Sequence, residues 1–232
     1  MIVPIFLMNR GCPHRCIFCN TRQIAGKDRE PLTEAYIRET VARYAAHRKT
    51  GTGQVALAFY GGNFTGMAMC EQKRLLAVTG GMIRDGMIDE VRMSTRPDDL
   101  GPEILDMLVE QGVGTIEIGV QSMNDRVLQL ARRGHTAEDV VRAVRLAKDR
   151  GITVGLHLMA GLPGDGGDTF AESVRRAIDL EPDMVRLHPT LVFADTVLAS
   201  MYHAGEYSPL GLSDAIRLCK RALVFFEKAG IP

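Results

Sequence analysis

The sequence alternates short apolar segments with longer amphipathic ones, and this alternation restricts the folds open to the chain. Six segments rich in β-branched and apolar residues are predicted as strands: residues 3–8, 54–60, 90–94, 115–120, 153–158 and 184–188. The segments between and after them have helical spacing and are predicted as helices: residues 33–49, 70–84, 102–111, 124–150, 169–180 and 212–229. Thr33 is a candidate N-cap, Gly112 is a candidate C-cap, and a break is expected near Gly134.

Strands that alternate with helices form βα units, whose strands run parallel. Crossovers between parallel strands are right-handed in nearly all proteins. The expected fold class is therefore α/β, a partial (β/α)6 TIM-like barrel with a curved parallel sheet. Polar and glycine-rich segments follow the carboxyl ends of the predicted strands, which is the edge where parallel barrels carry their sites. One shared site is expected at this edge.

Three of the five cysteines, Cys12, Cys16 and Cys19, lie in the loop after the first predicted strand. Their C-x3-C-x2-C spacing allows one loop to direct three thiolates at a small inorganic centre. An iron–sulfur cluster is one interpretation, because cysteine thiolates hold such clusters and three of them leave one iron open. A structural zinc site is another, with His14 as the local candidate for a fourth ligand. A disulfide fits poorly, because it leaves an odd cysteine and nothing indicates export.

Length and composition are those of an ordinary globular protein. The chain has 232 residues, 46% of them hydrophobic and 24% charged, which is enough for a sizeable core. The formal net charge is zero, so bulk charge gives no support for strong nonspecific binding of nucleic acid. No apolar run approaches the roughly 20 residues of a membrane span, and the first residues lack the features of a signal peptide. Together with the free thiols, these features predict a cytoplasmic protein without a membrane partner.

Several motifs point further than spacing alone. The cysteine motif has Phe18 before its last cysteine, and Gly61-Gly62 follows the second predicted strand. With these features the chain resembles the radical S-adenosylmethionine (radical SAM) enzymes over nearly its whole length. The resemblance is closest to the branch of the elongator catalytic subunit and the oxygen-independent coproporphyrinogen oxidases. That finer match is carried by I-G-V-Q-S at 118–122, R-G-H-T at 133–136, M-A-G-L-P-G at 159–164 and H-P-T-L-V at 188–192.

The resemblance implies a reaction and its cofactors. Cys12, Cys16 and Cys19 would ligate three irons of a 4Fe–4S cluster, and S-adenosylmethionine (SAM) would bind the fourth iron through its amino and carboxylate groups. One electron would cleave SAM to methionine and a 5′-deoxyadenosyl radical, which abstracts hydrogen from the substrate. That substrate would be tRNA or a small molecule such as a tetrapyrrole, and flavodoxin or ferredoxin would be the electron donor. A non-catalytic iron–sulfur or zinc-binding module is the alternative function, and no catalytic side chain is assigned.

The resemblance also assigns residues near the methionine and adenine ends of SAM. Phe18 matches a position that packs near the adenine, although it also fits a core aromatic at the base of a loop. Gly61 and Gly62 would let the backbone approach the methionine end, because they have no side chain. Asn63 follows where related enzymes often carry Glu or Thr-Pro-Thr, so the contact expected at this position departs from the family pattern.

Four later residues complete the predicted cofactor site. Ser94 matches a ribose-contacting position, and it could equally cap the next segment. Gln121 and Arg133 match cofactor-contacting positions, with Arg133 on the helix after the fourth strand and its guanidinium fork suited to the SAM carboxylate. His157 ends the fifth predicted strand where the oxidase branch has an acidic residue, so it is either a ribose contact or a core histidine. His188 closes the sixth strand and is expected to border the adenine or the substrate.

The remaining features receive structural interpretations. Cys70 and Cys219 lie in predicted helices without partners and are expected to be buried thiols. Glu117 and Asp125 do not form a recognisable acid–base pair. The chain is expected to be one radical SAM core domain, residues 1–232, truncated at its C-terminal end, since the last helix stops at Gly230 where another strand would begin.

Overall fold

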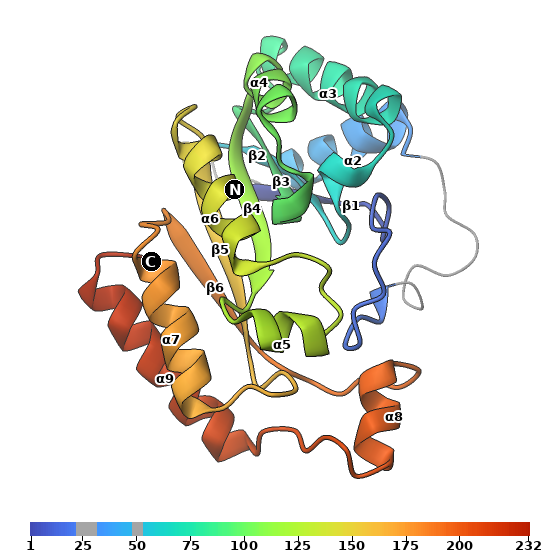
Figure 1. The fold of residues 1–232 in the computed structure, drawn as a ribbon. Helices are drawn as coiled ribbons and strands as arrows, with labels where there is room; N and C mark the ends of the chain where they lie inside the picture. The colour runs from blue at the N-terminus through green and yellow to red at the C-terminus, as the bar shows by residue number, and fades with distance from the viewer. Residues whose placement is uncertain (22–31, 48–52) are drawn as a thin grey trace.

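The computed structural model describes residues 1–21, 32–47 and 53–232. One six-stranded sheet forms its centre, with the strands in sequence order and every neighbouring pair parallel. Its strands are β1 (Ile2–Phe6), β2 (Ala56–Tyr60), β3 (Glu90–Thr95), β4 (Val113–Gln121), β5 (Thr153–Ala160) and β6 (Met184–Pro189). The sheet is curved, and helices cover its outer face (Figure 1). The predicted partial barrel is confirmed.

The helices return the chain from each strand to the start of the next. They are α2 (Glu34–Ala46), α3 (Met69–Arg84), α4 (Pro102–Glu110), α5 (Asp125–Leu130), α6 (Ala137–Lys148), α7 (Gly167–Ile178), α8 (Val197–His203) and α9 (Leu212–Lys228). Two short 3-10 helices, η1 (Phe64–Gly66) and η2 (Pro97–Asp99), follow β2 and β3. Thr33 caps α2 as predicted, because its hydroxyl accepts a hydrogen bond from the backbone N–H of Tyr36 at 3.1 Å. The predicted end of this helix, at residues 48–49, lies outside the described residues.

The helix predicted for residues 124–150 is broken near Gly134, as expected, and forms two helices. Asn124 caps α5, and Thr136 opens α6 with a capping box closed by Asp139. Between them Gly134 has a φ of 78°, which an L-residue adopts at a cost. Because each helix begins at its own cap, the connection between them is not helical, and it contributes a residue to the site. Helix α8 was not predicted, because its seven residues are too few to show a periodic pattern.

The main core lies between the sheet and its helices. Leu57, Ile116 and Leu156 are fully buried strand residues, and Leu76 and Val140 are fully buried on the helices that cover them. Cys219 is partly buried against this core. The prediction of a buried Cys70 is wrong, because this residue lies on an exposed face of the first turn of α3. Within the described residues, no helix is both long and apolar enough to span a membrane.

Candidate functional site

A cavity of about 300 Å³ lies at the carboxyl ends of the strands. All eleven predicted site residues line it, although they come from the loop after β1, from β2 to β5 and the segments at their ends, and from the connection between α5 and α6: Cys12, Cys16, Phe18, Cys19, Gly61, Gly62, Asn63, Ser94, Gln121, Arg133 and His157. The barrel geometry therefore brings together segments that are more than 140 positions apart in the sequence. The residues predicted separately from the sequence therefore line the same cavity.

The three cysteines contribute thiols from one side of the cavity. Cys16 is buried, and Cys12 and Cys19 are partly buried. Burial raises the pKa of the Cys12 thiol, against the opposing effect of its contact with the His14 backbone. Within the described residues, no three His, Cys, Asp or Glu side chains are close enough together to hold a single metal ion. Sulfurs on one tetrahedral zinc must lie about 3.8 Å apart, given a Zn–S distance of about 2.3 Å, whereas a cluster receives each thiolate on a separate iron.

Two distant segments hold the middle of the cysteine loop. The backbone N–H of Ile17 donates to the carbonyl of Ala131, just after α5, at 3.2 Å. The carbonyl of Ile17 accepts from the N–H of Leu198, at the start of α8, at 2.9 Å. The Ile17 side chain is buried against Leu198 and Tyr207. The unpredicted helix α8 thus fixes the loop that carries the cysteines, and Figure 1 shows this loop beside α5 and α8.

The segment after β2 holds the other end of the loop. A Cβ on Gly62 would lie 2.7 Å from the Cβ of Leu7 and 2.9 Å from the carbonyl oxygen of Arg10. The glycine is therefore required by the chain itself, in addition to any approach to a cofactor. The amide of Asn63 donates to the carbonyl of Gly11 at 2.9 Å and to Asp99 at 2.5 Å. Asn63 is buried, and it joins the cysteine loop to the segment after β3.

Two arginines carry positive charge into the cavity. Nη1 of Arg133 donates to the sulfur of Cys16 at 3.4 Å, and Nη2 donates to the carbonyl of Gly119. Arg96 donates through Nη2 to the carbonyl of Arg133 at 2.5 Å and to Asp98 at 2.9 Å. Both arginines are buried, and Nε of each, with Nη1 of Arg96, has no hydrogen-bond partner among the described residues. Buried donors of this kind favour an anionic ligand.

The prediction placed Arg133 on a helix, and this part of it is wrong. Arg133 lies in the connection between α5 and α6, because α5 ends at Leu130 and α6 begins at Ala137. Its position next to Gly134 also allows the ring of His14 to approach, since a Cβ on Gly134 would lie 2.2 Å from that ring. His14 lies 3.6 Å from Asp98, and burial and Arg96 lower its pKa.

Ser94 and Gln121 lie on strands whose ends face the cavity. Ser94 is paired in register with Glu117 on the next strand. Its alternative role as a helix cap is not supported, because the 3-10 helix that follows has Arg96 at its N-cap and no side-chain cap. Gln121 has a φ of 69° beside a register shift at the end of β4. A left-handed conformation at a non-glycine residue is strained and is often found at functional sites.

Glu117 is the centre of an ionic cluster that sequence reasoning missed. Its side chain has no exposed surface, and its carboxylate accepts hydrogen bonds from Tyr60, from Arg92 at 3.1 Å and from His157 at 2.8 Å. Arg186 lies 3.2 Å away on β6. Burial raises the pKa of Glu117, but hydrogen bonds from His157 and Tyr60 and the charge of Arg186 outweigh it and hold the pKa at about 2. The carboxylate is ionised at neutral pH.

The ionic cluster fixes the position of His157, and one feature of the sequence could have revealed the cluster. His157 is anchored by Glu117, its ring lies 5.3 Å from that of His188, and it lines the cavity. A glutamate in the apolar run T-I-E-I-G-V was the available signal, since ionisable residues are rarely buried without partners. The partners themselves lie on four other strands, at distances in the sequence that no local pattern reveals. Asp125 takes no part and accepts from the N–H of Ala137.

Phe18 lies between the cavity and two small apolar clusters. It lines the cavity. It also packs against the small apolar cluster of Val127, Ala131 and Leu162 and against the cluster around Ile17.

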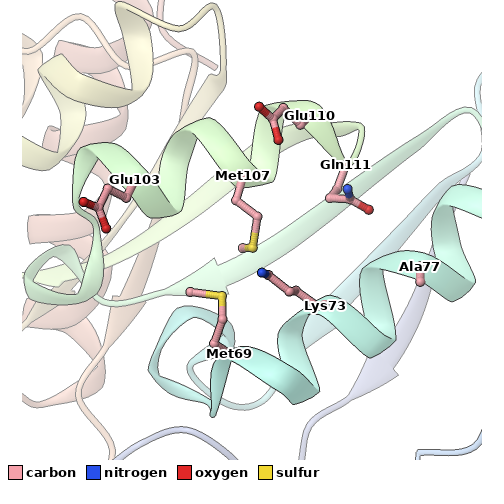
Figure 2. Close-up of a pocket in the computed structure, with 7 residues that line it drawn as sticks. All are labelled: Met69, Lys73, Ala77, Glu103, Met107, Glu110 and Gln111. Atoms are coloured by element: carbon pink, nitrogen blue, oxygen red, sulfur yellow. The ribbon is translucent and has the colours of Figure 1, made fainter.

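A second cavity, of about 560 Å³, lies on the outside of the barrel between α3 and α4. Figure 2 shows Lys73 extending between Met69 and Met107 across this groove. Glu103 and Glu110 lie along α4 on its other side. None of the predicted site residues lines it, and it is separate from the cavity at the strand ends.

Comparison with known proteins identifies the family. The sequence profile of the Radical SAM superfamily matches residues 6–177, and that of the Radical SAM C-terminal domain matches residues 182–232. The chain belongs to the radical SAM superfamily. The enzyme class is therefore confirmed, and with it the family's two cofactors, a 4Fe–4S cluster and SAM.

The relatives of this radical SAM chain include tRNA-modifying enzymes. It is 29% identical over 266 aligned residues to a tRNA uridine(34) acetyltransferase of Methanocaldococcus jannaschii, covering 98% of this chain and 49% of the relative. It is 28% identical over 218 residues to protein YhcC of Escherichia coli, covering 88% of this chain and 68% of that protein. The chain spans about half the length of the curated tRNA uridine(34) acetyltransferases it matches.

Solved structures show the same fold. The archaeal Elp3 of Methanocaldococcus infernus superposes with a TM-score of 0.73 at 25% identity, over 95% of this chain and 53% of that one. Coproporphyrinogen III oxidase of Escherichia coli, a radical SAM enzyme, superposes with a TM-score of 0.68 at 19% identity, over 99% and 52%. Both branches expected from the sequence motifs are thus among the similar structures.

The residues of the cavity fit the family's cofactors. The three thiols could hold three irons, and the glycines at 61–62 leave backbone open beside them. The unpartnered buried nitrogens of Arg96 and Arg133 could bind a carboxylate. This chemistry matches the donor set of a cluster and of an amino acid-derived ligand better than that of one zinc ion.

Proposed function

We propose that Cys12, Cys16 and Cys19 hold the 4Fe–4S cluster and that the cavity beside them binds SAM for reductive cleavage. The observation that carries this proposal is the convergence of all eleven predicted residues on one cavity. When bound, the cluster supplies the electron that cleaves SAM to methionine and a 5′-deoxyadenosyl radical, which then takes a hydrogen atom from the substrate.

The residues of this chain have the tasks of binding and orientation. Arg133 binds the SAM carboxylate with a guanidinium that its bonds to Cys16 and Gly119 already orient. Asn63 acts indirectly, because its side chain is fully used in holding the cysteine loop to the strands. Ser94 on β3 and His157 on β5 line the cavity on either side of β4 and bind the ribose. Phe18 lines the same cavity and would pack against the adenine.

The test is anaerobic reconstitution with iron and sulfide, followed by incubation with SAM and dithionite. The expected result is a brown protein with thiolate-to-iron absorption and formation of 5′-deoxyadenosine. Cys16→Ala should lose both properties. Cys70→Ala is the matched control, because this cysteine is exposed on α3 and should leave both unchanged. Tight zinc without a cluster, or a loaded protein that forms no 5′-deoxyadenosine, would favour the non-catalytic binding module instead.

For the substrate we propose tRNA, and for the electron donor flavodoxin or ferredoxin. Support for tRNA comes from the relatives, whose names specify uridine 34 of tRNA and whose similarity extends over 98% of this chain. A cytoplasmic location agrees with this substrate. Incubating deuterated tRNA or a deuterated tetrapyrrole with the reduced enzyme distinguishes the two substrate classes, because the true substrate transfers deuterium to 5′-deoxyadenosine. Transfer from the tetrapyrrole alone would overturn the tRNA proposal.

A further inference from the structure

The β6 side of the barrel carries polar and aromatic side chains that the proposed cofactor site does not use. Strands β1 and β6 end the strand order of the described sheet, so the barrel is open between them. Arg186 and His188 lie on β6, and Leu191 and Phe193 follow in the segment that leads to α8. Figure 1 shows this segment running from β6 along the carboxyl-end side of the molecule to α8.

Arg186 is anchored and still accessible. Its Nη2 donates to Oε1 of Glu117 at 3.4 Å and lies 3.2 Å from Oε2, and its guanidinium carbon lies 5.6 Å from the centre of the Tyr60 ring. Even so, 41% of its side chain is exposed. An arginine that is already held in one rotamer loses little further freedom when its remaining N–H groups bind a ligand. Arg186 is therefore preorganised to bind an anion at the open side of the cavity.

His188 is a second polar side chain on the same strand. It is exposed, and its ring lies 5.3 Å from that of His157. Burial lowers its pKa, and so do the charges of His157 and Arg186, while no carboxylate in the described part of the chain is among the causes. The stretch from residue 186 to residue 193 contains no acidic residue. The charge that attracts a phosphate here is that of Arg186, and the ring of His188 can form a hydrogen bond to the phosphate.

Phe193 and Leu191 give the same segment an apolar surface. Phe193 is 44% exposed and Leu191 is 61% exposed. Proteins recognise unpaired RNA by stacking its bases on aromatic rings while arginine and histidine contact its phosphates. The β6 segment offers both kinds of group beside the opening of the cavity.

We propose that Arg186, His188 and Phe193 form the surface that binds an unpaired segment of RNA and presents a nucleotide to the cavity. The proposal rests on the proposed tRNA substrate and assigns its contact surface. Arg186 and His188 contact phosphates, and Phe193 stacks on a base. Glu117 is a positioning residue here, since it holds Arg186 from inside the barrel.

The test measures binding of a fluorescein-labelled oligouridine of about eight nucleotides to the unreduced protein over a series of salt concentrations. Arg186→Gln should weaken binding and reduce the slope of log affinity against log salt by about 0.7, the value for one phosphate contact to a single strand. Phe193→Ala should weaken binding about tenfold, the effect of losing one stacked base, with no change in the slope. Arg175→Gln is the matched control, because Arg175 is 65% exposed on α7 and pairs only with Glu172 among the described residues.

Each outcome decides for or against the surface. Wild-type affinity in Phe193→Ala, or a slope in Arg186→Gln equal to that of the wild type, would overturn it. Displacement of the oligouridine by equimolar inorganic phosphate would also overturn it, since that result indicates a simple anion site. Cleavage of SAM by the reduced enzyme without RNA is measured separately in every variant. Loss of RNA binding in a variant that still cleaves SAM therefore supports this surface. Absence of SAM cleavage in the wild type would contradict the proposed function instead.

Discussion

Replacing Glu117 by glutamine tests whether one buried carboxylate holds the interior of the barrel together. The substitution keeps the size of the side chain and one acceptor oxygen, but it removes the charge that faces Arg92, Arg186 and His157. The pKa of Glu117 is held at about 2, below the ordinary value of 4.5. That difference corresponds to about 3 kcal/mol of folding free energy, at about 1.4 kcal/mol per pH unit. Breaking a buried ion pair typically costs 3–5 kcal/mol, which is of the same order.

The pH dependence carries the sharper expectation. Because the pKa is depressed in the folded state, the carboxylate contributes its full stabilisation above pH 4.5, and the contribution is lost as the pH falls towards 2. The wild type should therefore exceed Glu117→Gln by about 3 kcal/mol near neutral pH, with the gap narrowing by up to about 1.4 kcal/mol per pH unit below pH 4.5. Urea unfolding followed by circular dichroism, at several pH values between neutral and about pH 3, measures the gap.

The control is Glu172→Gln on α7, where the carboxylate is 51% exposed and pairs with Arg175. An exposed pair of this kind contributes about 0.2–1 kcal/mol, so its variant should follow the wild type at every pH. A gap below about 1 kcal/mol for Glu117→Gln, or one that does not depend on pH, would refute the assignment of Glu117 as an ionised hub.

Three further predictions concern the loop and the cofactors. Gly62→Ala should lose about 1–3 kcal/mol of stability in urea unfolding, because its Cβ would lie 2.7 Å from that of Leu7. Gly80→Ala in α3 should instead gain up to about 1 kcal/mol, and equal effects would contradict the close approach. Arg133→Lys should weaken SAM binding to the loaded protein at least tenfold in equilibrium dialysis, since a charge-assisted hydrogen bond contributes about 1.5–3 kcal/mol. Arg132→Lys, at an exposed neighbour, should not weaken it. Removing the iron with a chelator should abolish the visible absorption and leave the far-ultraviolet circular dichroism nearly unchanged, because the main core does not include Cys12, Cys16 or Cys19. Loss of helical signal would contradict this.

Much of the fold follows from local sequence patterns. All six strands were predictable because each is a short β-rich run flanked by glycine or polar residues, and buried parallel strands require such composition. Caps were predictable where the side chain acts on its own helix, as at Thr33. For the helix predicted at 124–150, a break was expected near Gly134. The length of the break could not be predicted, because the pattern of apolar residues continues through the connection. Helix α8 gives no comparable signal.

The sequence predicted which residues line the site, but it predicted few of the contacts between them. The cysteine spacing and the alignment of strand ends located the cavity, because parallel strands bring their carboxyl ends to one edge. The partners of Glu117 could not be read in advance. They lie 57, 25, 40 and 69 positions away, at Tyr60, Arg92, His157 and Arg186, and only the register of the sheet brings them together.

The cysteine loop depends on the whole barrel for its position. Asn63 holds it to the ends of β2 and β3, and Ala131 and Leu198 bind its middle from α5 and α8. Arg133, next to Ala131, donates to the sulfur of Cys16. Since these supports come from three different βα units, the loop is placed only when those units are packed together. A motif that can be recognised in eight residues thus obtains its geometry from contacts up to 181 positions away, which is why its spacing indicates the chemistry and the fold determines where that chemistry occurs.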